Sequence, residues 1–111
     1  MIDLLNEMND LSLRLTHSGD QLKRYGKELA QAEHDYKITL RQEALKLRAD
    51  GMPVTLIDKV VYGIPEVADK RLQRDIAETM YKASMESINT LKLKMRILDE
   101  QIKREWNSNG A

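Results

Sequence analysis

Two long amphipathic stretches of nearly equal length, about residues 3–49 and 65–106, constrain this chain more than any other feature. In each stretch, apolar and small side chains recur at steps of three or four residues, which places them on one stripe of a helix. An average step of 3.5 residues is the spacing of a coiled-coil seam, the line along which two helices pack. In the first stretch the predicted seam residues are Leu4, Met8, Leu11, Leu15, Ser18, Leu22, Tyr25, Leu29, Ala32, Tyr36 and Leu40. In the second stretch they are Ile76, Met80, Ser84, Ile88, Leu91, Met95, Leu98, Ile102 and Trp106.

The segment between the two stretches holds the signals that end one helix and begin the next. Gly51 suits the C′ position that follows a helix, and Pro53 cannot continue that helix. Thr55 is the expected N-cap of a single short helix that Gly63 closes. Pro65 suits the first turn of the following helix, where its missing N–H is not needed.

The sequence therefore predicts an all-α fold, a long antiparallel helical hairpin that is coiled-coil-like and has a short helix in its connector. The charged share of 32%, the absence of Phe and the lack of alternating β-branched residues all argue against a sheet. We expect one domain over residues 1–106, with helices at 3–49 and 65–106, a connector at 50–64 and a disordered tail at 107–111.

The first helix contains one uncertain place, at Ser18 and Gly19. Ser18 followed by Gln21 has the form of a capping box, which would restart a helix there. The unbroken phase of the seam favours instead a continuous helix, with a kink as a further option. Gly26, beside the seam, is expected to permit a close approach of the two helices.

The matched helix lengths also predict a register. Pairing about the middle of the connector puts Tyr36 near Met80. At the open end of the hairpin, Trp106 is expected to pack against Met8 or Leu11.

A two-helix seam of this length leaves its sides incompletely covered. Several apolar residues lie off the predicted seam and would be partly exposed in a monomer. Contiguous exposed apolar surface usually marks a contact with a partner. We therefore expect a homodimer that forms a four-helix arrangement. The off-seam residues are Ile38, Leu45, Leu93 and Ile97.

Charge and composition narrow the classes of function. The 18 basic residues balance 18 acidic ones, which argues against a general electrostatic binder of nucleic acid. The chain has no Cys, and His17 and His34 are expected to be exposed on a helix face without a second metal ligand. No phosphate loop, nucleophile motif or carboxylate pair stands out, and apolar runs are too short to span a membrane. We expect a non-enzymatic protein that needs no cofactor and no metal.

The connector is the leading candidate for a partner-binding surface. The candidate surface runs from Met52 to Ile64 and includes the off-seam residues Ile38 and Leu45. Its apolar residues can be presented at the end of a hairpin without disturbing the seam. The candidate binding residues are Met52, Leu56, Ile57 and Val60. The same residues also suit a simpler role, in which they fill the closed end of the hairpin. The leading hypothesis is that this surface binds another protein.

A second hypothesis is nucleic-acid binding by residues 45–74. This segment scans like a helix-turn-helix, with a short helix, a turn at Gly63 and a following helix that carries basic residues outward. Acidic residues within the segment dilute its positive charge. The candidate phosphate contacts are Arg48, Lys59, Lys70, Arg71 and Arg74.

Several short pieces of the sequence also resemble one group of proteins. The pieces are residues 30–37, 47–55, 75–78, 88–90 and 98–106, of which GMPVT at 51–55 and REW at 104–106 are the most distinctive. Over about residues 22–106 the chain resembles short helical proteins of tailed phages and prophages of Gram-positive bacteria. The resemblance implies a phage or prophage origin and action in the host cytoplasm, and it brings no catalytic or binding residues. It also admits a third hypothesis, an inhibitor of a host defence system.

Overall fold

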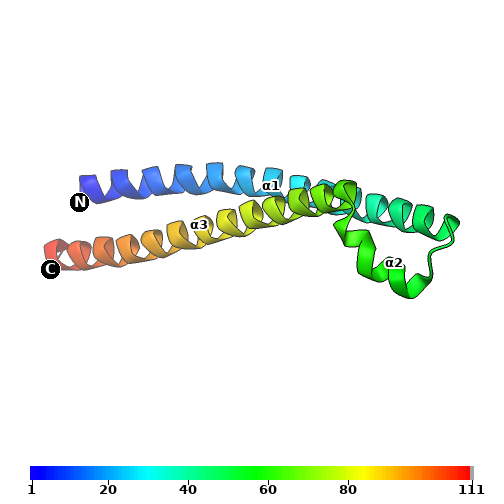
Figure 1. Cartoon of the computed structure of the whole chain (residues 1–111). Coiled ribbons are helices and arrows are strands. Elements are labelled where there is room, and N and C mark those ends of the chain that lie inside the picture. Colours follow the sequence, from blue (N-terminus) through cyan, green and yellow to red (C-terminus); the bar gives the residue numbers. More distant parts are fainter. Residues whose placement is uncertain (111) are drawn as a thin grey trace. The chain divides into compact units, whose positions relative to one another are not determined.

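A computed structural model describes the backbone of residues 1–110 and the side chains of residues 1–108. The elements, in chain order, are the helix α1 (Ile2–Ala49), the helix α2 (Val54–Val60), the 3-10 helix η1 (Val61–Gly63) and the helix α3 (Pro65–Gly110) (Figure 1). The described residues contain no strand. The predicted all-α helical hairpin, with a short helix between two long ones, is confirmed.

The helix bounds differ from the prediction in two places. α1 is continuous through Ser18 and Gly19, so the alternative in which a capping box restarts a helix there is wrong. α3 continues to Gly110, beyond the expected end near Trp106, and takes in most of the segment predicted to be a tail. No proline or glycine intervenes before Gly110 to stop the helix. Residue 111 lies outside the described residues.

The end of α1 is closed as the sequence predicts. Gly51 has a φ of +91°, in the left-handed region that glycine adopts without a steric cost. Its N–H donates to the carbonyl of Arg48 at 3.0 Å, and the N–H of Met52 donates to the carbonyl of Leu47 at 3.1 Å. This pair of bonds is a Schellman motif, which satisfies the last carbonyls of the helix and reverses the chain.

The start of α2 does not follow the prediction. The N-cap is Pro53, whose carbonyl accepts hydrogen bonds from the N–H groups of Leu56 and Ile57, both at 3.0 Å. Thr55 lies inside the helix, and no side chain caps it. The extended ψ of Pro53, 144°, aims its carbonyl along the new helix axis, so no side-chain cap is needed for the turn to form.

The chain then tightens into η1 and enters α3 at Pro65, as expected from the sequence. The N–H of Ile64 donates to the carbonyl of Val61 at 3.2 Å, which closes η1. The N–H of Ala68 donates to the carbonyl of Ile64 at 2.9 Å, which begins α3. No helix within the described range has both the length and the apolar character that a bilayer crossing requires.

The long helices contribute to two compact units, which we describe separately. Unit 1 comprises Met1–Arg24 and Lys82–Ala111, and unit 2 comprises Tyr25–Tyr81. Each unit has its own cluster of buried side chains.

Unit 1 is held by an aliphatic seam between α1 and α3. Leu11, Leu91 and Leu98 are buried in its core. The half-buried side chains that pack against them are Leu4, Met8, Leu15, Met95 and Ile102. All eight residues belong to the seams predicted from the sequence.

The chain ends in unit 1 are joined by charge rather than by an aromatic contact. The amino group of Met1 lies 3.4 Å from Oε2 of Glu105, which shows that the two helices run antiparallel there. Trp106 is 68% exposed, so the predicted packing of its indole against Met8 or Leu11 is wrong. Ile102 is the last residue of α3 that packs against the core of unit 1. Trp106, one turn later, lies on the outer side of the helix.

Unit 2 has a core built from three segments, which are α1, the connector with its helices α2 and η1, and α3. The buried residues are Tyr36 from α1, Ile57 from α2, Val61 from η1 and Val67 from α3. Val67 is fully buried. Half-buried neighbours complete the cluster, and they are Leu40, Ala44, Leu47, Met52 and Ile64. The last turns of α1 therefore share a core with the connector, which Figure 1 shows folded beside them.

The predicted seam of α3 is wrong in unit 2. Ile76 and Met80 are 54% and 42% exposed. Among the half-buried positions of α3 in this unit, Lys70, Arg74, Ala77 and Tyr81 continue the seven-residue repeat of unit 1 backward through the helix.

The predicted register fails for the same reason. The guanidinium carbon of Arg74, and not Met80, lies over the ring of Tyr36, at 4.7 Å from its centroid. The prediction had both long helices entering the turn together. In the structure α2 and η1 take up that space, so α3 begins opposite an earlier turn of α1.

Candidate interaction surface

The described residues offer little that resembles an enclosed reaction site. Every buried side chain among them is apolar, and no buried polar atom lacks a partner. Within the same residues, no group of three or more His, Asp or Glu side chains is arranged to hold a metal ion. The features to examine are therefore grooves and exposed surfaces.

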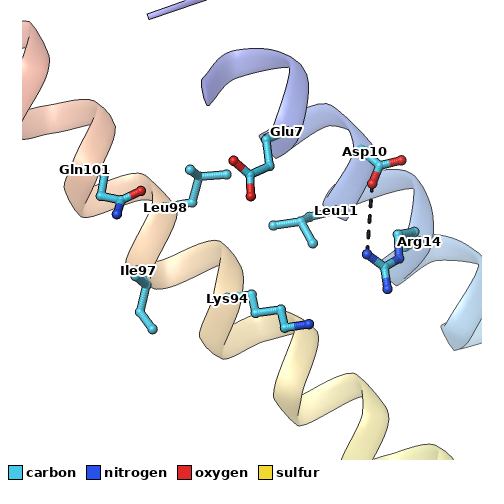
Figure 2. Close-up of a pocket in the computed structure, with 8 residues that line it drawn as sticks. All are labelled: Glu7, Asp10, Leu11, Arg14, Lys94, Ile97, Leu98 and Gln101. Carbon is cyan, nitrogen blue, oxygen red and sulfur yellow. Dashed lines mark ion pairs between the residues drawn. The ribbon is translucent and has the colours of Figure 1, made fainter. Parts of the chain in front are cut away.

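One open groove follows the side of the seam in unit 1 (Figure 2). It encloses about 410 Å³, with Leu11 and Leu98 projecting toward one another between the helices. Its rim is charged, and Asp10 and Arg14 approach each other there at 4.0 Å. Lys94 of α3 lies on the same rim. The groove lies along a two-helix seam, with acidic Glu7 and Asp10 and basic Arg14 and Lys94 beside it.

The connector carries a more distinctive surface in unit 2. We define the connector surface as Val54, Leu56, Val60 and Tyr62, which are 57%, 44%, 37% and 44% exposed. Leu56 and Val60 lie one helical turn apart and so share a face of α2. Of the seven residues of α2, only Ile57 is buried. A short helix in this chain therefore presents most of its apolar side chains to solvent.

The four partner-binding residues predicted from the sequence separate into two groups. Leu56 and Val60 lie on the connector surface. Ile57 is 6% exposed and belongs to the core of unit 2, and Met52 packs half-buried against that core. Both interpretations of the connector thus apply, but to different residues.

Val54 and Tyr62 lie within the predicted surface from Met52 to Ile64, but they were not among its four candidate binding residues. The available signal was the spacing of Ile57 and Val61, which are four residues apart and share one inward face. With that face assigned to the core, the remaining apolar residues of the connector point elsewhere. Ile38 and Leu45 of α1, predicted to be partly exposed, are 43% and 52% exposed in the same unit.

Arg74 is the most engaged of the predicted phosphate-binding residues. Its Nη2 and Nε donate to Oδ1 of Asp75 at 2.8 and 3.1 Å. The hydrogen bond to Asp75 raises the pKa of the Arg74 guanidinium. The same group stacks over Tyr36, an arrangement typical of a cation–π contact. Arg74 is thus part of the packing between α1 and α3.

The other four basic residues differ in their exposure and contacts. Arg71 stacks over the ring of Tyr62 at 5.5 Å, and Lys70 is half-buried at a seam position. Arg48 and Lys59 are exposed, the first at the end of α1 and the second on α2. The structure therefore does not gather the five predicted side chains into one exposed basic patch.

A small polar network covers α1 in unit 2. Nε2 of Gln31 donates to Oδ1 of Asp35 at 2.9 Å, and Nδ1 of His34 lies 3.4 Å from the same oxygen. The hydrogen bond from Gln31 and then that from His34 lower the pKa of the Asp35 carboxyl. The side chain of His34 is 65% exposed, as expected from the sequence. The network has the character of a solvated helix surface.

Comparison with known proteins does not place the chain in a family. No family model matches it, and no curated protein or solved structure is significantly similar to it.

Proposed function

We propose that this protein is a non-enzymatic helical interaction protein whose connector surface binds a phage or host protein. The observation that supports the proposal is the exposure of Val54, Leu56, Val60 and Tyr62 on one short segment. Burying a Val or Leu side chain is worth about 1.5–3 kcal/mol. A partner that covers this segment gains a large contribution from few residues.

The connector surface is also preorganised. Ile57 and Val61 anchor α2 and η1 in the core of unit 2, so the outward residues do not have to be ordered when a partner binds. Tyr62 stacks with Arg71, and both residue types are enriched among those that dominate binding energies. The best-suited partner surface is an apolar groove or helix face with a polar rim.

The phage or prophage origin and the host cytoplasm as site of action rest on the sequence resemblance alone. Under this proposal the partner is made by the phage or by its host. No side chain in the structure favours inhibition of a host defence system over other protein contacts, so that hypothesis adds no separate test.

The test is recovery of partners from phage-infected host cells with tagged protein, with and without nuclease. The variant Leu56→Asp/Val60→Asp places two charges on the connector surface. It should lose the partner and keep the thermal midpoint, because both side chains are already exposed. The control Leu93→Asp/Ile97→Asp changes two equally exposed apolar residues of unit 1 and should keep the partner.

Nuclease treatment separates this proposal from nucleic-acid binding. Recovery that survives nuclease and depends on Leu56 and Val60 supports a protein partner. Phosphate binding would be supported instead if nuclease abolished the recovery. The affinity should then fall as the salt concentration rises, with a slope that increases with the number of basic residues in contact with phosphate. The variant Arg48→Ala/Lys59→Ala removes two of the three exposed candidates and should then lower the salt dependence by about two units.

A further inference from the structure

A second apolar surface lies on α3 in unit 2, apart from the connector surface. We define the α3 ridge as Leu72, Ile76 and Met80, which are 58%, 54% and 42% exposed. They follow one another at steps of four residues, which is one of the two ridge directions on a helix surface. The core of unit 2 contains none of them.

The centre of the α3 ridge is flanked by uncharged side chains. Gln73 and Thr79, which lie three residues before and after Ile76, carry no charge. Asp69 and Asp75 lie three residues before and after Leu72, so that end of the ridge is bordered by acidic groups. The exposed side of α1 in the same unit carries more charge, with Lys27, His34, Lys37 and Arg41 beside Glu33. Three large exposed apolar side chains around an uncharged centre are suited to burial.

We propose that a second copy of this chain packs its α3 ridge against this one, antiparallel about a two-fold axis at Ile76. The ridge is evenly spaced about Ile76, so reversing it leaves its pattern unchanged. Leu72 then meets the partner's Met80, and Gln73 meets the partner's Thr79. Ridges of this kind interdigitate at a crossing angle of about −50°.

A second copy fits this face better than an unrelated partner does. A two-fold contact uses the same patch on both sides, so the patch must be complementary to itself. Here apolar meets apolar and neutral meets neutral, and no charged side chain faces its own copy near the axis. The antiparallel arrangement also opposes the dipoles of the two α3 helices, which is favourable.

The chain contains no cysteine, which allows a direct test by cross-linking. A two-fold axis at Ile76 brings that residue beside its own copy, within the reach of a disulfide. Under mild oxidation, Ile76→Cys should therefore become a covalent dimer. The matched control Lys37→Cys, on the exposed side of α1, should form no covalent dimer. Equal cross-linking of the two variants would overturn the proposed axis.

Sedimentation equilibrium tests the self-association without a cross-link. The wild-type chain should sediment as a dimer at tens of micromolar. Ile76→Glu should weaken the dimer about a hundredfold, because two buried isoleucines are lost. Leu93→Glu, which alters an exposed leucine of unit 1, should leave the dimer intact. A wild-type mass of 12.8 kDa would refute the proposal.

The two proposals fail independently. Leu56→Asp/Val60→Asp changes the connector surface and should leave the dimer unaffected, whereas Ile76→Glu should leave the connector surface unaltered. A wild-type dimer together with a failure to recover any partner protein from infected cells would support the α3 ridge and contradict only the proposed function.

Discussion

Units 1 and 2 use the same two helices but build different cores. In unit 1, α1 and α3 meet through leucines, methionines and an isoleucine, and two helices suffice. In unit 2 the core also contains Ile57 of α2 and Val61 of η1. The seven-residue repeat of α3 continues through both units, but its side chains are mostly large and apolar in unit 1 and mostly polar or small in unit 2.

The difference arises from what α3 offers at its seam positions. In unit 2 these positions include Lys70, Arg74 and Ala77, which supply little apolar volume. Tyr36 of α1 therefore packs its ring against the Arg74 guanidinium on one side and belongs to the connector's apolar cluster as well. A coiled-coil repeat thus fixes which residues face inward, while a third element determines whether that inward face becomes a core.

The largest expected effect concerns unit 1. Leu98→Ala removes a side chain that is 4% exposed and should lower the free energy of unfolding by about 2–5 kcal/mol in a urea melt. The control Leu93→Ala, at a leucine that is 51% exposed, should change it by less than about 0.5 kcal/mol. Equal midpoints for the two variants would mean that the aliphatic seam does not hold unit 1.

The next effect tests whether the connector is part of the core of unit 2. Ile57→Ala should cost about 2–4 kcal/mol, because it empties a site shared by α1, α2 and α3. Amide exchange over α2 should speed up at the same time. Leu56→Ala, one residue away but 44% exposed, is the matched control and should cost less than about 0.5 kcal/mol. A connector that merely links the helices would respond equally to both.

A smaller effect is expected from the aromatic contact of Arg74. In a double-mutant cycle with Arg74→Ala and Tyr36→Leu, the coupling energy should be about 0.5–1 kcal/mol. The equivalent cycle with Arg48→Ala and Tyr36→Leu should give a coupling near zero, because Arg48 is exposed at the end of α1. Similar coupling energies for Arg74 and Arg48 would mean that the contact between Arg74 and Tyr36 does not stabilise unit 2.

The smallest effects compare one glycine from each unit. A Cβ at Gly19 would meet nothing within 4 Å, and one at Gly26 would lie 3.5 Å from Cε2 of Tyr81, an ordinary van der Waals distance. Gly19→Ala and Gly26→Ala should each stabilise the fold by about 0.5–1 kcal/mol in thermal or urea melts. A loss at Gly26 alone would show that α1 and α3 approach more closely there than the structure indicates.

The sequence predicted unit 1 better than unit 2 for a physical reason. Leucines and methionines at heptad spacing in unit 1 admit only one stripe as the seam. In unit 2, Ile76 and Met80 extend that stripe at an allowed step of four, and they are more apolar than Arg74 and Ala77. A search for apolar residues at helical spacing therefore favoured Ile76 and Met80, which are exposed, over Arg74 and Ala77, which face inward. The repeat of seven, counted without regard to polarity, would have found the right positions.

The connector surface, like the seam of unit 2, was predicted only in part. Leu56 and Val60 were placed on it and are exposed, but Ile57 was also included and is buried. A short helix gives too few turns for periodicity to separate its faces. Which residues of α2 face the core depends on where α1 and α3 lie. The sequence of the connector alone does not give the positions of these two helices.

The three-segment core of unit 2 also bears on how the chain folds. Its contacts join residues close in sequence, such as Ile57 with Val67, whereas the contact of Leu11 with Leu98 closes a loop of most of the chain. Closing a short loop costs less chain entropy. We therefore expect the nucleus of folding to lie around the Schellman turn, with the aliphatic pairs joining later toward the chain ends. Substitutions at Val61 should then slow folding, and those at Leu98 should mainly speed unfolding.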